Sequence, residues 1–265
     1  MAGFARKVKK SPLKTKPLRL AGQSLRDERD RVIDEDLMPP FVIALVAVAV
    51  TLLEWWRWFV KVPPQPGFYT FLAVCAIGYC AYRTWKIRPQ LASLKLGLQG
   101  EVMVGQYLDS HRGADWCVFH DIPGPDFNVD HVVVTPKGVF TVETKTRSKP
   151  RGNAVVTYDG KKVLVDGFAP DRDPVVQASA ARRWVHDLLL ETTAIDYPVR
   201  GVVLFPGWFV ESPSNLGRND VWVLNEKGFV KYVENGAAVI KDEDVALAAA
   251  RLANHVTNWA DAQHV

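Results

Sequence analysis

Two long apolar segments near the start of the chain predict a pair of membrane-spanning helices. The first covers residues 39–62 and the second covers residues 68–85. A membrane helix needs about 20 residues, or roughly 17 at the short end, and both segments reach this length when their interfacial residues are included. The joining residues 62–67 are rich in proline and end in glycine, which predicts a tight, helix-breaking turn. We therefore expect a transmembrane helical hairpin over residues 38–88.

Aromatic side chains occur at the ends of both segments, as is typical of the two interfaces of a bilayer. They are Trp55, Trp56 and Trp58 in the first segment and Tyr82 and Trp85 in the second. The acidic residue Glu54 argues against a membrane-spanning position for this part of the first segment. We expect Glu54 to lie close to the interface, within reach of Arg57. A pair of core helices or a re-entrant element is the alternative to a spanning hairpin.

From residue 89 to residue 265 the apolar positions follow helical and strand periods in turn, which predicts one α/β domain. Helices are expected near residues 90–111, 174–191 and 243–261. Strands are expected near residues 116–122, 129–135, 138–145, 199–205 and 221–224, with a further hairpin near residues 154–166. The order αβββαβ predicts a core with a mixed central sheet.

Charged residues interrupt two of these expected strands. One strand carries Asp130, the next carries Glu143 and Lys145, and the turn residues 135–138 join the two strands into a hairpin. With the two central turn residues as the loop, Asp130 lies opposite Glu143, with their Cβ atoms roughly 5 Å apart. Lys145 returns to the same face because successive strand residues alternate. A glycine bulge at Gly138 is the alternative, and it would shift the register by one residue.

These three side chains suit metal-dependent phosphodiester hydrolysis. Carboxylate oxygens prefer hard cations, so Mg²⁺ or Mn²⁺ fits Asp130 and Glu143 better than zinc does. Such an ion would polarise a phosphoryl oxygen and make a bound water more acidic. Lys145 could orient that water or offset developing charge. The alternative is an exposed strand end with solvated charges, or a Glu143–Lys145 surface pair of little energetic weight.

Two helices carry polar residues on their apolar sides. Glu101 lies on a stripe with leucines and is expected at the same metal site, as a direct ligand or through water; the alternative is an acid favoured by the helix dipole. Asp173-Pro174 predicts a helix start. Gln177 then lies near a substrate phosphate or a metal-bound water, or else is a buried amide satisfied by the backbone. His131 alternates to the strand face opposite Asp130, and we interpret it as a packed core histidine.

Four blocks of residues carry a resemblance to a known family. They are Gly100-Glu101, Asp130-His131, Gly138-Val139-Phe140 leading to Glu143-Thr144-Lys145, and Pro174 with Gln177-Ala178. In this order they resemble the nuclease-related domain (NERD) over roughly residues 95–205. That domain is similar to the PD-(D/E)xK nuclease superfamily, which has a restriction-endonuclease-like α/β core. Val129 stands where the superfamily name has proline, a frequent departure.

The resemblance implies a role for each matching position. Asp130 and Glu143 would be metal ligands, and Lys145 would be the catalytic lysine. Glu101 and Gln177 would be accessory polar residues from the flanking helices. The resemblance also admits a homodimer, since many nucleases of the superfamily act as dimers.

The net charge of +4 is modest and does not by itself argue for DNA binding. Basic residues after the charged hairpin could hold a phosphate backbone, and a solvated loop is the alternative. They are Arg147, Lys149, Arg151, Lys161 and Lys162. The three cysteines predict neither a disulfide framework nor a zinc site, which agrees with a reducing compartment.

Residues 1–37 are basic and then mixed in charge, so we expect a mostly disordered tail with a short helix at most. Such a tail can bind anionic lipid or nucleic acid, or only set the topology. Further basic residues follow the second apolar segment, namely Arg83, Lys86 and Arg88. The positive-inside rule then places both termini in the cytoplasm.

The sequence thus predicts a membrane-anchored, Mg²⁺- or Mn²⁺-dependent nuclease at the cytoplasmic face of a lipid bilayer. Its expected substrate is nucleic acid, with DNA preferred over RNA. The alternative is a catalytically silent nuclease-fold module that binds nucleic acid or scaffolds an assembly at the membrane.

Overall fold

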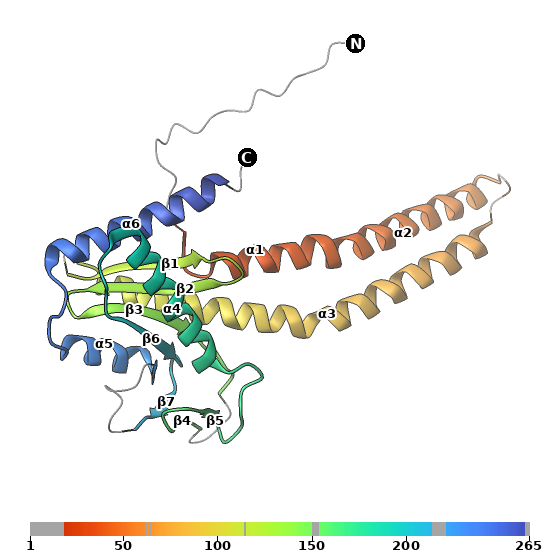
Figure 1. Ribbon diagram of the computed structural model, residues 1–265. Coiled ribbons are helices and arrows are strands. Elements are labelled where there is room, and N and C mark those ends of the chain that lie inside the picture. Colours follow the sequence, from red (N-terminus) through yellow and green to blue (C-terminus); the bar gives the residue numbers. More distant parts are fainter. Residues whose placement is uncertain are drawn as a thin grey trace, which may run out of the picture.

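The computed structural model describes residues 19–61, 63, 65–113, 115–149, 154–213 and 221–262. Figure 1 shows a long helical hairpin that projects from an α/β body. The two long helices of the hairpin run side by side and antiparallel, and the second of them continues into the body.

The first helical stretch begins earlier than expected. Helix α1 (Gln23–Arg31) runs through a π-helical segment η1 (Val32–Leu37) directly into α2 (Met38–Phe59). The expectation of a mostly disordered tail is therefore wrong for residues 23–37, while residues 1–18 lie outside the described residues. The helix is stabilised by tertiary contacts, because Val32 is buried and Arg83 forms an ion pair with Asp36 at 2.8 Å.

Among the described residues, one helical segment is long and apolar enough to cross a membrane. It is Gln23–Phe59, in which a stretch of 18 residues has a mean hydropathy of 2.2. The second expected span does not meet the same criterion. Its apolar stretch lies at the start of α3 (Pro66–Asp109) and is interrupted by the charged residue Arg83. Both helices nevertheless expose large apolar side chains, including Phe59 at 73% and Trp85 at 72%.

Helix α3 also joins two elements that the sequence predicts as separate. The helix expected near residues 90–111 is its second half, and the expected boundary between residues 88 and 89 falls inside it. Pro89 lies within the helix, although proline removes one backbone hydrogen bond and usually breaks a helix. The hairpin and the α/β body are thus connected by a continuous helix.

The main sheet has five strands in the order β1-β2-β3-β6-β8. Their bounds are Cys117–Pro123 for β1, Asn128–Thr135 for β2, Gly138–Thr144 for β3, Val199–Leu204 for β6 and Val221–Leu224 for β8. The pairs β1–β2 and β2–β3 are antiparallel, whereas β3–β6 and β6–β8 are parallel. The predicted α/β fold with a mixed central sheet is confirmed.

A second, smaller sheet has the order β5-β4-β7. The strands β4 (Val155–Tyr158) and β5 (Val163–Val165) form the expected hairpin, whereas β7 (Phe209–Glu211) was not predicted. Helix α5 (Glu226–Glu234) was not predicted either. Helices α4 (Pro174–Thr193) and α6 (Asp242–Ala262) lie where the sequence places them.

Helices cover both faces of the main sheet (Figure 1). The second half of α3 and α5 pack on one face, against Val133, Phe140 and Val142. Helices α4 and α6 pack on the other face, against Val132 and Val139. Strand residues alternate between the faces, so neighbouring residues of β2 and β3 meet different helices.

Candidate active site

Strands β2 and β3 bring the predicted charged residues together. Their ladder pairs Thr135 with Gly138 and His131 with Val142, and its next position places Asp130 opposite Glu143. The register predicted from the two-residue loop is thereby confirmed, without a bulge along the paired residues. The backbone N–H of Thr144 donates to Asp130 Oδ2 at 2.7 Å, which fixes the carboxylate across the end of the hairpin.

The side chain of Lys145 lies beside that of Glu143 on the same face of the strand, as the alternation along the strand predicts. Its Nζ is 2.6 Å from Glu143 Oε1, and the two side chains are 28% and 14% exposed. This burial separates the pair from an ordinary surface ion pair, because most of its surroundings are protein. The backbone N–H of Lys145 also donates to Leu204 O at 2.8 Å. The hydrogen bonds to β6 therefore extend one residue beyond the end of β3.

Helix α4 covers the face that carries these three residues. A Cβ at Gly201 would lie 2.9 Å from the carbonyl oxygen of Ala178, so glycine allows α4 to approach β6 closely. Gly201 pairs with Thr141, two residues before Glu143. Gly201, Thr141 and Glu143 therefore point to the same face, beneath the first turns of α4.

Gln177 belongs to this part of α4. Asp173 caps the helix by accepting a hydrogen bond from the N–H of Val175 at 2.9 Å, and Pro174 follows at the first helical position, as predicted. Gln177 is half-buried, and its Oε1 is buried without a hydrogen-bond partner. Buried polar atoms are usually paired, so the free Oε1 is an acceptor available to a bound group.

Glu101 comes from α3, the helix on the opposite face, and still reaches the same carboxylates electrostatically. Burial, and after it the charges of Asp121 and Glu143, raise the pKa of Glu101 to about 8, with Lys145 acting in the opposite direction. Burial also raises the pKa of Asp130 well above its usual range, and Glu143 and Glu101 act in the same sense. The site therefore carries more negative charge than its surroundings stabilise.

The donor set fits a hard divalent cation in its chemistry, because Asp130, Glu143 and Glu101 all offer carboxylate oxygens. The acids that raise one another's pKa would be relieved by a cation between them. Within the described part of the chain, however, no three His, Cys, Asp or Glu side chains lie close enough together to form a ready metal-binding group. Glu143 is instead held by Lys145, and Asp130 by the backbone of Thr144.

Asp121, to which the sequence assigned no role, connects the start of the described chain to the body. It is 1% exposed, forms an ion pair with Arg19 at 2.6 Å, and accepts hydrogen bonds from the N–H of Ser24 and from Asn128 Nδ2. Residues 19–24 are thereby held beside Glu101, since a Cβ at Gly22 would lie 3.6 Å from Glu101 Oε2. Asp121 is thus an anchor for this segment as well as a cause of the raised pKa of Glu101.

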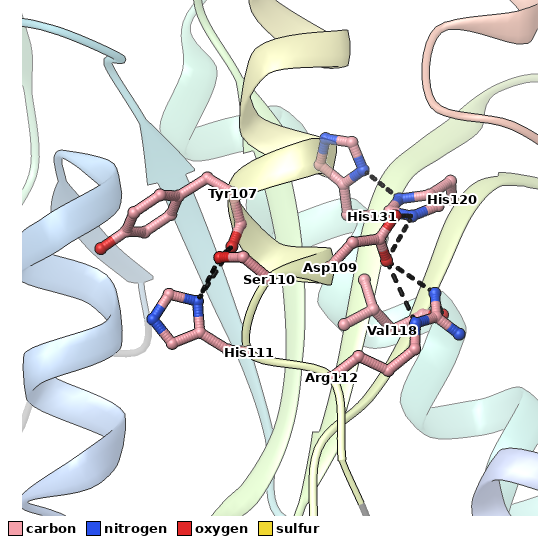
Figure 2. A network of polar contacts seen from close by, with 8 residues as sticks. All are labelled: Tyr107, Asp109, Ser110, His111, Arg112, Val118, His120 and His131. Carbon is pink, nitrogen blue, oxygen red and sulfur yellow. Dashed lines mark hydrogen bonds and ion pairs between the residues drawn. The ribbon is translucent and has the colours of Figure 1, made fainter.

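His131 lies on the other face of β2 and is part of a polar network that leads from the core to the exposed residues Asp109 and Arg112 (Figure 2). Its Nδ1 is 2.9 Å from His120 Nδ1, and His120 Nε2 is 3.1 Å from both carboxylate oxygens of Asp109. Arg112 completes the chain by donating to Asp109 Oδ1 at 2.7 Å. His131 is 0% exposed, which agrees with its interpretation as a packed core histidine.

The contacts assign the protons of this network. His120 Nε2 faces a carboxylate and therefore carries a proton, which leaves Nδ1 of a neutral His120 as an acceptor. His131 Nδ1 then donates to it, and His131 Nε2 is a buried acceptor without a partner. Burial lowers the pKa of both histidines, most strongly that of His131, which favours the neutral form of both rings.

The predicted nucleic-acid-binding residues divide between two places. Arg147 and Lys149 line a cleft next to the Lys145 site. Lys161 and Lys162 lie apart from it, at the β4–β5 turn, where Asp159 accepts hydrogen bonds from both of their N–H groups. Arg151 lies outside the described residues.

Two cleft residues, Phe168 and Arg172, were missed in the sequence. Phe168 follows the turn dipeptide Asp166-Gly167, and Arg172 directly precedes the α4 cap. The turn dipeptide and the helix cap are both recognisable in the sequence, so the neighbouring positions of Phe168 and Arg172 could have been predicted to flank the site.

A mixed sheet between helices, with two facing acids and a lysine at the end of a central hairpin, defines an α/β protein of nuclease-like fold. Residues 96–206 match the nuclease-related domain (NERD) family. This part of the chain is therefore similar to the nuclease-related domain, over nearly the same residues as the resemblance noted in the sequence, and the match suggests a nuclease-like function. Comparison with curated proteins and with solved structures gave no match.

Proposed function

We propose that the chain is a membrane-anchored, divalent-metal-dependent nuclease that hydrolyses phosphodiester bonds, with DNA preferred over RNA. The observation that carries the proposal is the facing pair Asp130 and Glu143 with Lys145 at 2.6 Å from Glu143, inside a nuclease-related domain. Partly buried charges cost folding free energy, whereas the same groups supply the ligands and the positive charge that phosphodiester hydrolysis needs.

Each side chain has a distinct part in this proposal. Asp130 and Glu143 would hold Mg²⁺ or Mn²⁺, with Glu101 as a direct ligand or through water. The cation, when bound, polarises a phosphoryl oxygen and acidifies water. Lys145 provides positive charge to offset the negative charge that develops on the phosphate oxygens. Gln177 contributes its unpartnered Oε1 as an acceptor that orients water.

We also propose that residues 38–88 anchor the nuclease-like domain, residues 89–265, as a two-span hairpin with both termini in the cytoplasm. The apolar surfaces of α2 and of the first half of α3 support the second span. Glu54 lies near the turn between the helices, where it pairs with Arg57 at 2.8 Å and accepts a hydrogen bond from the N–H of Gln65 at 3.1 Å. This position suits an interface rather than the centre of a bilayer.

The test is cleavage by the full-length protein in detergent micelles, on circular DNA, linear DNA and RNA. Mg²⁺, Mn²⁺ and EDTA are compared for the wild type and for Lys145→Ala. Lys227→Ala, on the exposed side of α5, is the matched control for loss of a lysine. We expect metal-dependent cutting that is lost in Lys145→Ala and kept in the control.

Absence of cutting on all three substrates would contradict the enzymatic proposal. If nucleic acid is still bound, the result would favour the silent binding module instead. Cutting of circular DNA would in addition show that the enzyme is an endonuclease.

A further inference from the structure

The Lys145 site continues into a larger cleft. The pocket beside Lys145 has a volume of about 230 Å³ and shares Arg147, Pro170 and Asp171 with a neighbouring cleft of about 600 Å³. The shared lining residues place the two hollows next to each other. The larger volume lies in the range of about 300–1,000 Å³ that is typical of small-molecule sites, so it suits a ligand of the size of a nucleotide.

Positive charge extends along this path. Lys145, Arg147, Lys149 and Arg172 line the two hollows, and they outnumber the lining acids Asp166 and Asp171. The ion pair between Arg147 and Asp171 is long, at 3.5 Å, and the Asp171 side chain is 94% exposed. Such an exposed pair contributes little, so Arg147 can exchange this partner for a phosphate.

One wall of the cleft is formed by the aromatic ring of Phe168, whose backbone is held by several hydrogen bonds. Phe168 is 77% exposed. Its backbone is bonded to Val165 in both directions, at 2.8 and 3.0 Å. The two residues between them, Asp166 and Gly167, have φ angles of 51° and 81°, as in a type I′ turn. The N–H of Asp166 donates to Val155 O at 2.9 Å, which ties the turn to β4 and presents Phe168 from a well-ordered backbone.

A second aromatic side chain lies in the floor of the cleft. Trp208 is 4% exposed and donates from Nε1 to Arg147 O at 3.4 Å. The Lys149 ammonium is 5.7 Å from the centroid of the Trp208 ring, a favourable distance for a cation–π contact. Trp208 thus positions the two basic residues opposite the turn that carries Phe168.

We infer that this cleft binds an unpaired nucleotide of the substrate strand, with the base stacked on Phe168 and the phosphates near Arg147 and Lys149. A ring face can stack on a base only where that face is free, which is the case in single strands and at frayed ends but not inside a duplex. The inference rests on the proposed nuclease function, because it takes the strand bound here to be the one that leads to Lys145. It makes single-stranded nucleic acid, or duplex with an unpaired end, the substrate class.

Binding of the full-length protein to a labelled single-stranded oligodeoxynucleotide tests the inference, with a blunt duplex of the same sequence for comparison. The measurement is fluorescence anisotropy in EDTA, so that cleavage does not interfere. Phe168→Ala and Phe168→Leu remove the aromatic face, while Phe168→Tyr keeps it. Phe209→Ala is the matched control, since Phe209 is also exposed, at 61%, but does not line the cleft.

We expect the wild type to bind the single strand more tightly than the duplex. Phe168→Ala and Phe168→Leu should both weaken single-strand binding by about 10-fold or more, with less than about a two-fold change for the duplex. Phe168→Tyr and Phe209→Ala should bind like the wild type. Full affinity in Phe168→Leu, an equal loss for both nucleic acids, or an effect of Phe168→Ala on liposome binding or self-association alone would overturn the inference.

The same variants separate this inference from the nuclease proposal. If the single strand binds through Phe168 but no substrate is cut, the cleft is confirmed and the catalytic proposal fails. If Lys145-dependent cutting occurs without any dependence of single-strand binding on Phe168, the enzyme is confirmed and the proposed stacking site fails.

Discussion

Asp130 and His131 are neighbours on β2, yet they lie in opposite kinds of polar surroundings. Asp130 faces α4 together with Glu143, and burial and neighbouring acids raise its pKa. His131 faces α3, where His120 and Asp109 complete a chain of contacts. One face therefore gathers like charges, while the other links His131, His120 and Asp109 by hydrogen bonds and leaves only His131 Nε2 of this chain without a partner among the described residues.

We take this difference to distinguish the proposed ligand site from a structural network. A polar network that serves only the fold is stabilised when its members satisfy one another, as His120 and Asp109 do. On the α4 face the acids repel each other and Gln177 Oε1 lacks a partner. Repulsive, unsatisfied groups are retained where an additional group from outside relieves them. The α4 face is accordingly the one that we assign to chemistry.

The largest effect is expected from Asp130→Asn. The variant removes a negative charge while an amide oxygen can still accept the hydrogen bond from Thr144 N. We expect cleavage to fall by more than about 100-fold, because even the outer partners of metal ligands are each worth about 10–100-fold. Without metal, the free energy of unfolding should stay unchanged or rise by up to about 1 kcal/mol, because the buried charge is gone. Cleavage assays and urea unfolding check the two expectations, and a strongly destabilised Asp130→Asn would contradict the contrast between the faces.

The next largest effect is expected from His131→Ala, and on stability instead of activity. Removal of a fully buried ring leaves a cavity and deprives His120 of its partner, at a cost of about 3 kcal/mol. His111→Ala is the control, because His111 contacts the nearby Tyr107 carbonyl oxygen from a less buried position and should cost under about 1 kcal/mol. Urea unfolding in EDTA measures both. At a temperature where His131→Ala is folded, we expect its cleavage rate to be close to that of the wild type. His131 would then affect stability alone, whereas Asp130 affects activity.

The sequence was most informative where local rules determine the structure. The Asp130–Glu143 register follows from a two-residue loop and from strict alternation along both strands, and neither depends on the rest of the fold. The start of α4 follows from the Asp173-Pro174 cap for the same reason. The prediction that Glu143 and Lys145 share one face required only that the backbone remain extended for one residue beyond the hairpin.

What could not be predicted depends on contacts between distant segments. The His120–His131 contact requires the β1–β2 register, and the helical structure of residues 23–37 requires packing against α3. Strand β7 has only three residues and exists through its pairing with β4. Helix α5 did offer a local signal, since Asn225 caps it by accepting from Gly228 N at 2.8 Å, and this cap was overlooked in the sequence.

The smallest expected effect is a pH dependence of opposite sign for the raised carboxylates and for the buried histidines. The pKa of Glu101 is raised to about 8 and that of Asp130 is also raised. Their contribution to stability is therefore present at low pH and is lost as the pH rises through the folded-state values. The pKa values of His120 and His131 are lowered. Their contribution is present above the unfolded value of about 6.5 and is lost as the pH falls below it.

Between pH 7 and pH 5 the raised carboxylates and the histidines thus act against each other in the metal-free protein. In the double variant Glu101→Gln, Asp130→Asn the contribution of these carboxylates is absent, so we expect its free energy of unfolding to fall by about 2 kcal/mol more than that of the wild type over this range. Urea unfolding in EDTA at closely spaced pH values measures the difference. If the variant and the wild type show the same pH dependence, Glu101 and Asp130 do not carry the raised pKa values, and the distinction between the acidic site and the histidine network loses its electrostatic basis.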